Sequence, residues 1–154
     1  MVWIEAAASH QAIVHGPREE IIALIRNVSM SGPMFPGVDR IEDLGENRYR
    51  WRIKERRTLG TSFTGNYVAE YTDTDDGVSW KTIEGNMKTR GRWRASGRDG
   101  HVLVHVEAAT ELDAPVPRFL KAPAQLFATK ETRDGLKAQL TGMKKFIEAA
   151  ASQP

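Results

Sequence analysis

The chain has 154 residues, of which 40% are hydrophobic and 27% charged, a balance that indicates one folded domain over residues 1–154 and excludes intrinsic disorder. Its formal net charge of +2 argues against the concentrated basic face of nucleic-acid-binding proteins, and the absence of cysteine excludes disulfides and thiolate chemistry. No apolar run approaches the roughly 18 residues of a membrane span, and the first residues lack a signal-peptide pattern. We therefore expect a cytoplasmic protein without a transmembrane segment.

The N-terminal part of the sequence predicts a strand, a helix and then an irregular segment. Residues 4–15 include the strand-like run "AIVH", and Gly16-Pro17 then begins a helix, since proline at the first helical position loses no hydrogen bond. Apolar residues at helical spacing from Ile21 to Val28 give that helix one buried face. Glycines and prolines end regular structure in the segment "SMSGPMFPG" (29–37), which nevertheless carries two methionines and a phenylalanine.

Between residues 38 and 112 apolar and polar residues alternate, which is the period of strands with one buried face. Short turns such as "DDG" and "RDG" separate these strands and predict antiparallel pairing between consecutive ones. In several strands the aromatic residues share one face and the arginines lie on the other. The expected strands are 38–45, 47–54, 60–74, 78–85, 88–97 and 101–112.

The C-terminal residues return to a helical period. Apolar residues from Leu136 to Ile147 recur at steps of four, three and four, so we expect one amphipathic helix from about Pro123 to Ala149. One long helix after a run of strands must cover one face of their sheet. The predicted fold is therefore α+β: a seven-stranded antiparallel sheet wrapped around a long C-terminal helix, with short helices after the first strand.

Three stretches match a known pattern in the same order: "AIVHGPREEIIALI" (12–25), "FPGVDRIEDLGENRYRWRI" (35–53), and "SWKTIEG" (79–85) followed by Gly91. Together they resemble the START-like helix-grip superfamily (SRPBCC), which includes the birch-pollen-allergen family, over nearly the whole chain. The nearest branch is similar to polyketide cyclase/dehydrase and coenzyme Q-binding proteins. The resemblance implies a cavity between the sheet and the C-terminal helix that holds a hydrophobic molecule such as a lipid, quinone or polyketide.

The aromatic face of the sheet and the apolar stripe of the long helix are the candidate cavity lining, because ligand pockets are mostly apolar and aromatic. Two interpretations of segment 29–37 stay open: its apolar residues form an adaptable rim at the cavity mouth, or they plug the open end of the sheet as core. The candidate ligand-binding residues are Met30, Met34, Phe35, Tyr49, Trp51, Phe63, Tyr67, Trp80, Trp93, Leu126, Thr129, Arg133, Leu136 and Leu140.

Residues suited to catalysis or metal binding are sparse. His105 faces His10 if the first and last strands pair, but no HExxH motif occurs, and we expect no metal and no cofactor. Glu70, Glu84 or Glu107 supplies an acid or base if one of them faces the cavity, which alternation alone leaves open.

The leading interpretation is a non-catalytic protein that binds or transports a hydrophobic small molecule. The alternative is a polyketide cyclase/dehydratase-type enzyme that uses the same cavity, and a third class is an assembly factor that binds protein clients there. Arginines that alternate with aromatics are also typical of single-strand nucleic-acid platforms, but here the two residue types lie on opposite faces, so we expect no nucleic-acid partner. A weak homodimer stays open.

Overall fold

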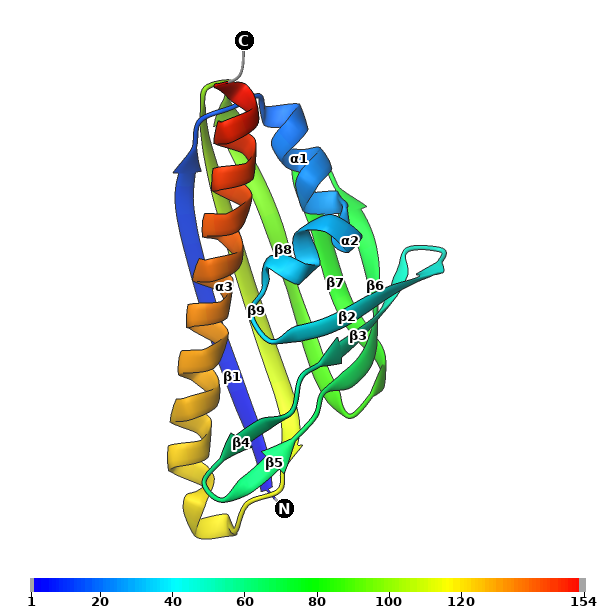
Figure 1. Ribbon diagram of the computed structural model, residues 1–154, viewed down its shortest axis with the longest axis vertical. Coiled ribbons are helices and arrows are strands. Elements are labelled where there is room, and N and C mark those ends of the chain that lie inside the picture. Colours follow the sequence, from blue (N-terminus) through cyan, green and yellow to red (C-terminus); the bar gives the residue numbers. More distant parts are fainter. Residues whose placement is uncertain (1, 153–154) are drawn as a thin grey trace.

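A seven-stranded antiparallel sheet curves around one long helix, which confirms the predicted α+β helix-grip arrangement (Figure 1). The computed structural model describes residues 2–152. The strands of the main sheet are β1 (Val2–Val14), β2 (Val38–Gly45), β3 (Arg48–Ile53), β6 (Asn66–Thr74), β7 (Gly77–Gly85), β8 (Met87–Arg98) and β9 (His101–Ala114), in the spatial order β1-β9-β8-β7-β6-β3-β2. The helices are α1 (Arg18–Arg26), α2 (Val28–Ser31) and α3 (Lys121–Ala151), with the 3-10 turns η1 (Gly32–Met34) and η2 (Arg118–Leu120).

The segment 60–74, predicted as one strand, is divided. Strand β5 (Thr61–Phe63) pairs with β4 (Arg56–Thr58) in a separate two-stranded sheet, and β6 begins only at Asn66. Leu59 and Gly60 have φ angles of 55° and 79°, which is the left-handed conformation that a tight hairpin turn requires. The resulting β4–β5 hairpin leaves the main sheet and extends toward the N-terminal part of α3 (Figure 1).

Helix α1 ends earlier than its apolar spacing predicts. Asn27 stops it and caps the next helix, because its side-chain oxygen accepts a hydrogen bond from the N–H of Met30 at 3.2 Å. Val28 therefore begins α2 instead of continuing α1. Proline at position 17 precedes the first helical residue and has a φ of −66°. The two short helices cover the β6–β8 part of the sheet beside α3 (Figure 1).

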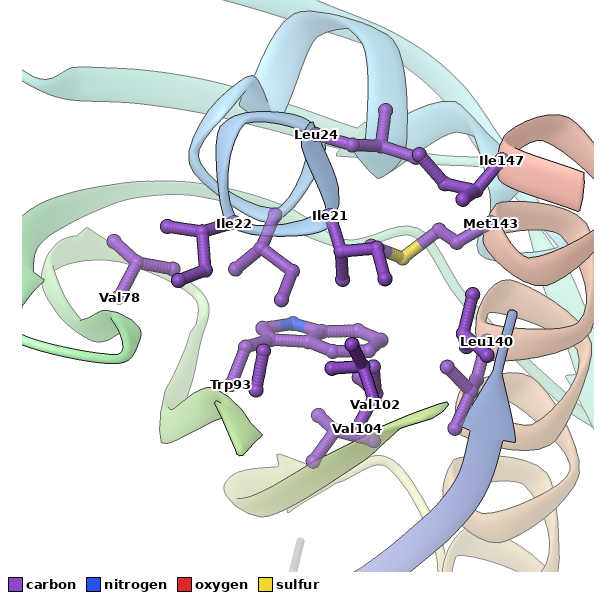
Figure 2. Packing of buried hydrophobic residues seen from close by; sticks show 14 of the residues in the cluster. Ile21, Ile22, Leu24, Val78, Trp93, Val102, Val104, Leu140, Met143 and Ile147 are labelled. Atoms are coloured by element: carbon purple, nitrogen blue, oxygen red, sulfur yellow. The ribbon is translucent and has the colours of Figure 1, made fainter. Parts of the chain in front are cut away.

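Trp93 of β8 lies at the centre of the largest hydrophobic cluster. Figure 2 shows its indole ring between Ile21 and Ile22 of α1 on one side and Val104 of β9 on the other, with Leu140 of α3 beside it. Ile21, Val104 and Leu140 are each no more than 2% exposed. Side chains thus fill the space between the sheet and the C-terminal half of α3, so that any cavity must lie toward the other end of the helix.

The convex face of the sheet is covered by cross-strand ion pairs. The arginines that alternate with the aromatics point to this face, as the strand period predicts. Most of them pair with a glutamate on another strand, whereas Arg94 meets His105. Glu70, Glu84 and Glu107, considered above as acid–base candidates, are therefore engaged outside the concave face. The pairs are Arg48–Glu70 at 3.2 Å, Arg50–Glu84 at 3.0 Å, Arg52–Glu42 at 2.8 Å and Arg92–Glu107 at 3.2 Å.

The end of β1 is attached to the last turns of α3 by a small polar cluster. Lys144 Nζ donates hydrogen bonds to the carbonyl oxygen of Ile13 and to Glu148 Oε2, both at 2.7 Å, and the N–H of His15 donates to the same carboxylate at 2.9 Å. The hydrogen bond from Lys144, helped by that from His15, lowers the pKa of Glu148 below its ordinary value. The ionised carboxylate is thus stabilised by folding.

Glu148→Gln should reduce the stability of the protein at neutral pH but not in acid. A carboxyl whose pKa is lowered by folding contributes stability above its unfolded-state pKa, and this contribution is lost as the pH falls through the folded-state pKa. We expect the urea midpoint of the variant to lie below that of the wild type at about pH 7, and the two to converge near about pH 3. Glu46→Gln, on the exposed β2–β3 turn, is the control. If the urea midpoints of the wild type and Glu148→Gln differ as much in acid as at neutral pH, the charge of the carboxylate is not the cause of the difference.

Candidate functional site

A cavity of about 260 Å³ lies between the concave face of the sheet and the N-terminal half of α3. The sheet supplies its back wall, α3 and the α2–η1 segment supply its front, and the β4–β5 hairpin closes one side. Trp93 forms the boundary with the filled core described above. The predicted residues that line this cavity are Phe35, Trp51, Phe63, Tyr67, Trp80, Trp93 and Leu136. That these residues contact a ligand stays a prediction.

Four predicted residues of α3 do not line the cavity. Leu126 is 74% exposed, the hydroxyl of Thr129 donates to the carbonyl of Gln125 at 2.8 Å, and Arg133 forms an ion pair with Asp134 on the solvent side. Leu140 is 1% exposed, but it belongs to the filled core. Apart from Phe127 and Leu136, the helix face that does line the cavity carries small or polar residues, and these give no apolar signal in the sequence. They include Ala124, Ala128, Glu131, Thr132 and Gln139.

Segment 29–37 combines the two interpretations that the sequence left open. Phe35 lines the cavity and its ring lies against Gly135 of α3, where an added Cβ would overlap it. Met34 packs against the core cluster, with its sulfur 3.4 Å from the Cβ position of Gly142, so it is core and not rim. Met30 is 41% exposed and lies away from the cavity. The segment is therefore a wedge between sheet and helix, of which Ser31, Gly32 and Phe35 reach the cavity.

Three aromatic residues on β3 and β6, Trp51, Tyr67 and Tyr71, line the cavity wall. Trp51 and Tyr67 stack with ring centroids 6.1 Å apart and 8° between their planes. Tyr71 lies beyond them, with Tyr49 packed edge-on against it at 5.5 Å. Tyr71 lines the cavity and Tyr49, predicted to do so, does not. Burial raises the pKa of both Tyr67 and Tyr71 above the ordinary value, so their hydroxyl groups stay protonated.

The indole nitrogens of Trp80 and Trp51 differ in their hydrogen bonding. Trp80 Nε1 donates to Thr89 Oγ1 at 3.2 Å. Trp51 Nε1 is fully buried and has no hydrogen-bond partner in the described part of the chain. It approaches the Tyr71 hydroxyl closely enough to offset part of the rise in that group's pKa, but without the geometry of a hydrogen bond. A buried donor left unpaired costs about 1–3 kcal/mol, so Trp51 is an unusual feature of this wall.

One ion pair lies on the cavity wall, and sequence reasoning did not identify it. Arg56 of the β4–β5 hairpin pairs with Glu131 of α3, and both side chains are more than one third exposed. Among the described residues that line the cavity, Glu131 is the one carboxylate. Nothing in the local pattern of either segment signals this contact, because the two residues are far apart in the sequence and meet only when the hairpin folds over the helix.

The first and last strands pair as predicted, but their histidines do not meet. In the β1–β9 register Gln11 is opposite His105 and Val106 is opposite His10. Adjacent residues of a strand point to opposite faces, so the two histidines are on different faces of the sheet. The same register brings Ala6 and Thr110 together on the cavity wall, where residues of β1 and β9 contribute lining that the sequence analysis overlooked. The lining residues of β1 and β9 alternate with residues of the opposite face, and this alternation could have identified them from the sequence.

No protein-family model and no curated protein matches this chain. Among solved structures, it is similar to a protein from Thermus thermophilus, with a TM-score of 0.72 and 18% identity over 96% of this chain and 99% of that one. A START superfamily protein from Mycobacterium smegmatis gives 0.70 and 14% over 94% and 98%, and the Zhui aromatase/cyclase from a Streptomyces species gives 0.63 and 16% over 95% and 98%. The chain thus has the START-like helix-grip fold. Within the described residues, no helix combines the length and apolarity needed to cross a bilayer.

Proposed function

We propose that this protein binds a hydrophobic small molecule in the cavity between the sheet and α3. The observation that carries the proposal is the cavity itself, about 260 Å³ in volume and lined by aromatic and aliphatic side chains with few polar groups. This composition is typical of small-molecule sites, and a well-packed interior does not otherwise keep so large an apolar space. The fold shared with a START superfamily protein supports the same reading.

Binding without chemistry is favoured over a polyketide cyclase/dehydratase-type activity. The fold likeness to an aromatase/cyclase supports the enzymatic alternative. That activity requires an acid or base side chain that points at the ligand. Glu131, the carboxylate on the described wall, is paired with Arg56. The raised pKa values of Tyr67 and Tyr71 disfavour either hydroxyl as a base. The wall is therefore better suited to holding a ligand than to moving its protons.

Thr110→Phe should weaken the binding of a neutral fluorescent probe such as N-phenyl-1-naphthylamine. Thr110 lies on the cavity wall opposite Ala6, so a phenyl ring at this position would enter the space that the probe needs. We expect the dissociation constant to rise at least about tenfold, which corresponds to about 1.4 kcal/mol. Fluorescence titration at equal concentrations of folded protein measures the change.

Ala109→Phe is the matched control, because the neighbouring residue points to the convex face, where it is in register with Arg90. It adds a phenyl ring to the same strand but leaves the cavity untouched, so probe affinity should stay near that of the wild type. Equal losses in both variants, or no loss in either, would count against this cavity as the binding site.

Native mass spectrometry of protein purified from its own host would test the proposal without an artificial probe. We expect a mass excess that organic extraction removes and that Thr110→Phe reduces. If the wild type carries no such mass and binds no apolar probe, the proposed function is wrong. A molecule that leaves chemically altered after incubation would instead favour the enzymatic alternative.

A further inference from the structure

Three large apolar side chains at the start of α3 lie in solvent. Phe119 of η2 is 81% exposed, and Leu126 and Phe127 of α3 are 74% and 41% exposed. Phe119 and Leu126 are seven residues apart in the chain, which is about 10 Å along a helix. We call these three residues the η2–α3 patch. Leu59 is exposed too, at the tip of the β4–β5 hairpin, which extends toward this end of α3 (Figure 1).

The packing of the core does not account for the η2–α3 patch. Val116, Leu120 and Ala124 recur at every fourth residue and pack on the cluster at the ends of β1 and β9, so the inner side of this segment is already apolar. Neither Phe119 nor Leu126 belongs to a hydrophobic cluster of the described residues. Large apolar side chains that gather in solvent, unlike single scattered ones, are typical of a surface that meets an apolar partner.

Positive charge without negative charge lies beside the patch. From Ala114 to Lys130 the chain contains Arg118, Lys121 and Lys130 and no acidic residue. Arg118 and Lys121 are exposed, and neither has an ion-pair partner in the part of the chain that the structure describes. Most arginines of the convex face, by contrast, pair with glutamates. The patch therefore offers apolar and cationic contacts together.

The patch also lies where the cavity approaches the surface. Phe127 lines the cavity and is partly exposed, so it belongs to both the cavity wall and the patch. Pro115 and Ala124, which precede and follow η2 in the chain, line the cavity as well. An apolar molecule that leaves a lipid phase at the patch is thus close to the cavity.

We infer that the η2–α3 patch docks this protein on the surface of an anionic lipid bilayer, with Phe119 and Leu126 inserted at the boundary of the acyl chains and Arg118 and Lys121 at the lipid phosphates. Aromatic and aliphatic side chains beside lysine and arginine are the composition that binds such interfaces. The docking goes beyond the proposed function and does not depend on it. Only the exchange of a ligand between the bilayer and the cavity rests on the proposed function.

A bilayer fits the patch better than a second copy of the chain or an acidic protein does. Phe119 and Leu126 protrude and line neither hollow of the described surface, so they offer no shape for a partner's side chains to fill. A two-fold dimer through the patch would bring Arg118 and Lys121 close to the same cations of the second copy, and like charges repel. A fluid lipid surface needs no matching shape, and its phosphates supply the opposite charge.

Phe119→Ser and Phe146→Ser form the first matched pair of variants. Both remove an exposed phenyl ring, but Phe146 lies in the last turns of α3, about 40 Å further along the helix. Binding is measured by flotation with vesicles of equal parts phosphatidylcholine and phosphatidylglycerol, at equal amounts of folded protein. We expect the partition coefficient of Phe119→Ser to fall about tenfold and that of Phe146→Ser to stay near the wild-type value.

The double variants Arg118→Glu/Lys121→Glu and Lys137→Glu/Lys145→Glu form the second pair. Each lowers the net charge by the same amount, and Lys137 and Lys145 are exposed on α3 outside the patch. The wild type should prefer the mixed vesicles over vesicles of phosphatidylcholine alone, and rising salt should weaken this preference. The first double variant should lose the preference, and the second should keep most of it.

Two results would overturn the inference: no binding of the wild type to the mixed vesicles, or equal binding by the two members of either pair. A dimer detected by light scattering in place of vesicle binding, and abolished by Phe119→Ser, would assign the patch to a second copy instead. Titration with N-phenyl-1-naphthylamine without vesicles separates the inference from the proposed function, because Phe119 does not line the cavity and its replacement should leave probe affinity unchanged. A protein that binds vesicles but no apolar probe would keep the docking surface and lose the proposed function, and the reverse result would do the opposite.

Discussion

Leu140→Ala should lower the free energy of unfolding by about 2–5 kcal/mol, the range for truncating a large aliphatic side chain in a packed core. Leu140 is 1% exposed and lies beside Trp93 in the filled part of the molecule, outside the cavity (Figure 2). We expect a lower urea midpoint with little change in slope, because the fold is retained. Probe affinity per folded molecule should stay close to that of the wild type.

Leu126→Ala is the control for this prediction, since the same substitution on the same helix cancels any difference in helix propensity. Leu126 is 74% exposed, so its truncation should change the free energy of unfolding by less than about 0.5 kcal/mol. Similar losses in the two variants would mean that the buried and exposed faces of α3 are not those described here.

Gly85→Ala should destabilise the protein more than Gly100→Ala does, although each adds one methyl group at a glycine with positive φ. Gly85 has a φ of 128°, which side-chain-bearing residues rarely adopt, and its Cβ would overlap the backbone of Asn66 and Tyr67 on β6. A backbone in a paired strand cannot rotate away as the end of a side chain can. We expect a loss of about 3 kcal/mol or more, seen as a lower melting temperature.

Gly100→Ala separates the conformational cost from the steric one. Gly100 has a φ of 86° and nothing within 4 Å of its Cβ position, so alanine there meets only the backbone penalty of about 1–2 kcal/mol. Equal losses at the two positions would show that the close approach of β6 to Gly85 contributes nothing.

The order of the elements and the two faces of the sheet could be predicted from sequence because both depend on local patterns. Alternation around Trp51 and Trp93 assigned these residues to the concave face, and both are less than 10% exposed. The turn at "DDG" and the helical spacing from Leu136 to Ile147 are likewise properties of neighbouring residues, and the structure has the corresponding turn and helix.

The cavity itself was less predictable, because it forms where the side chains are too small to fill the interior, and small residues give no distinctive sequence pattern. Ala124 and Ala128 line it from α3 and carry no distinguishing signal, whereas the larger Leu126 suggested a buried stripe and lies in solvent. The contact between Arg56 and Glu131 depends on a hairpin that the strand pattern of residues 60–74 concealed. Local periodicity identifies which face of a strand or helix points to the interior. It does not show where the interior side chains leave a space unfilled.

The wedge formed by Phe35 also bears on how such a chamber can change over evolutionary time. Its ring occupies the notch at Gly135, so bulk at one position excludes bulk at the other. A smaller side chain on the loop combined with a larger one on the helix, or the reverse, would reshape the chamber while every hydrogen bond of the sheet stays in place. The shape of the proposed binding site can thus change through paired exchanges at positions 35 and 135 while the fold is kept.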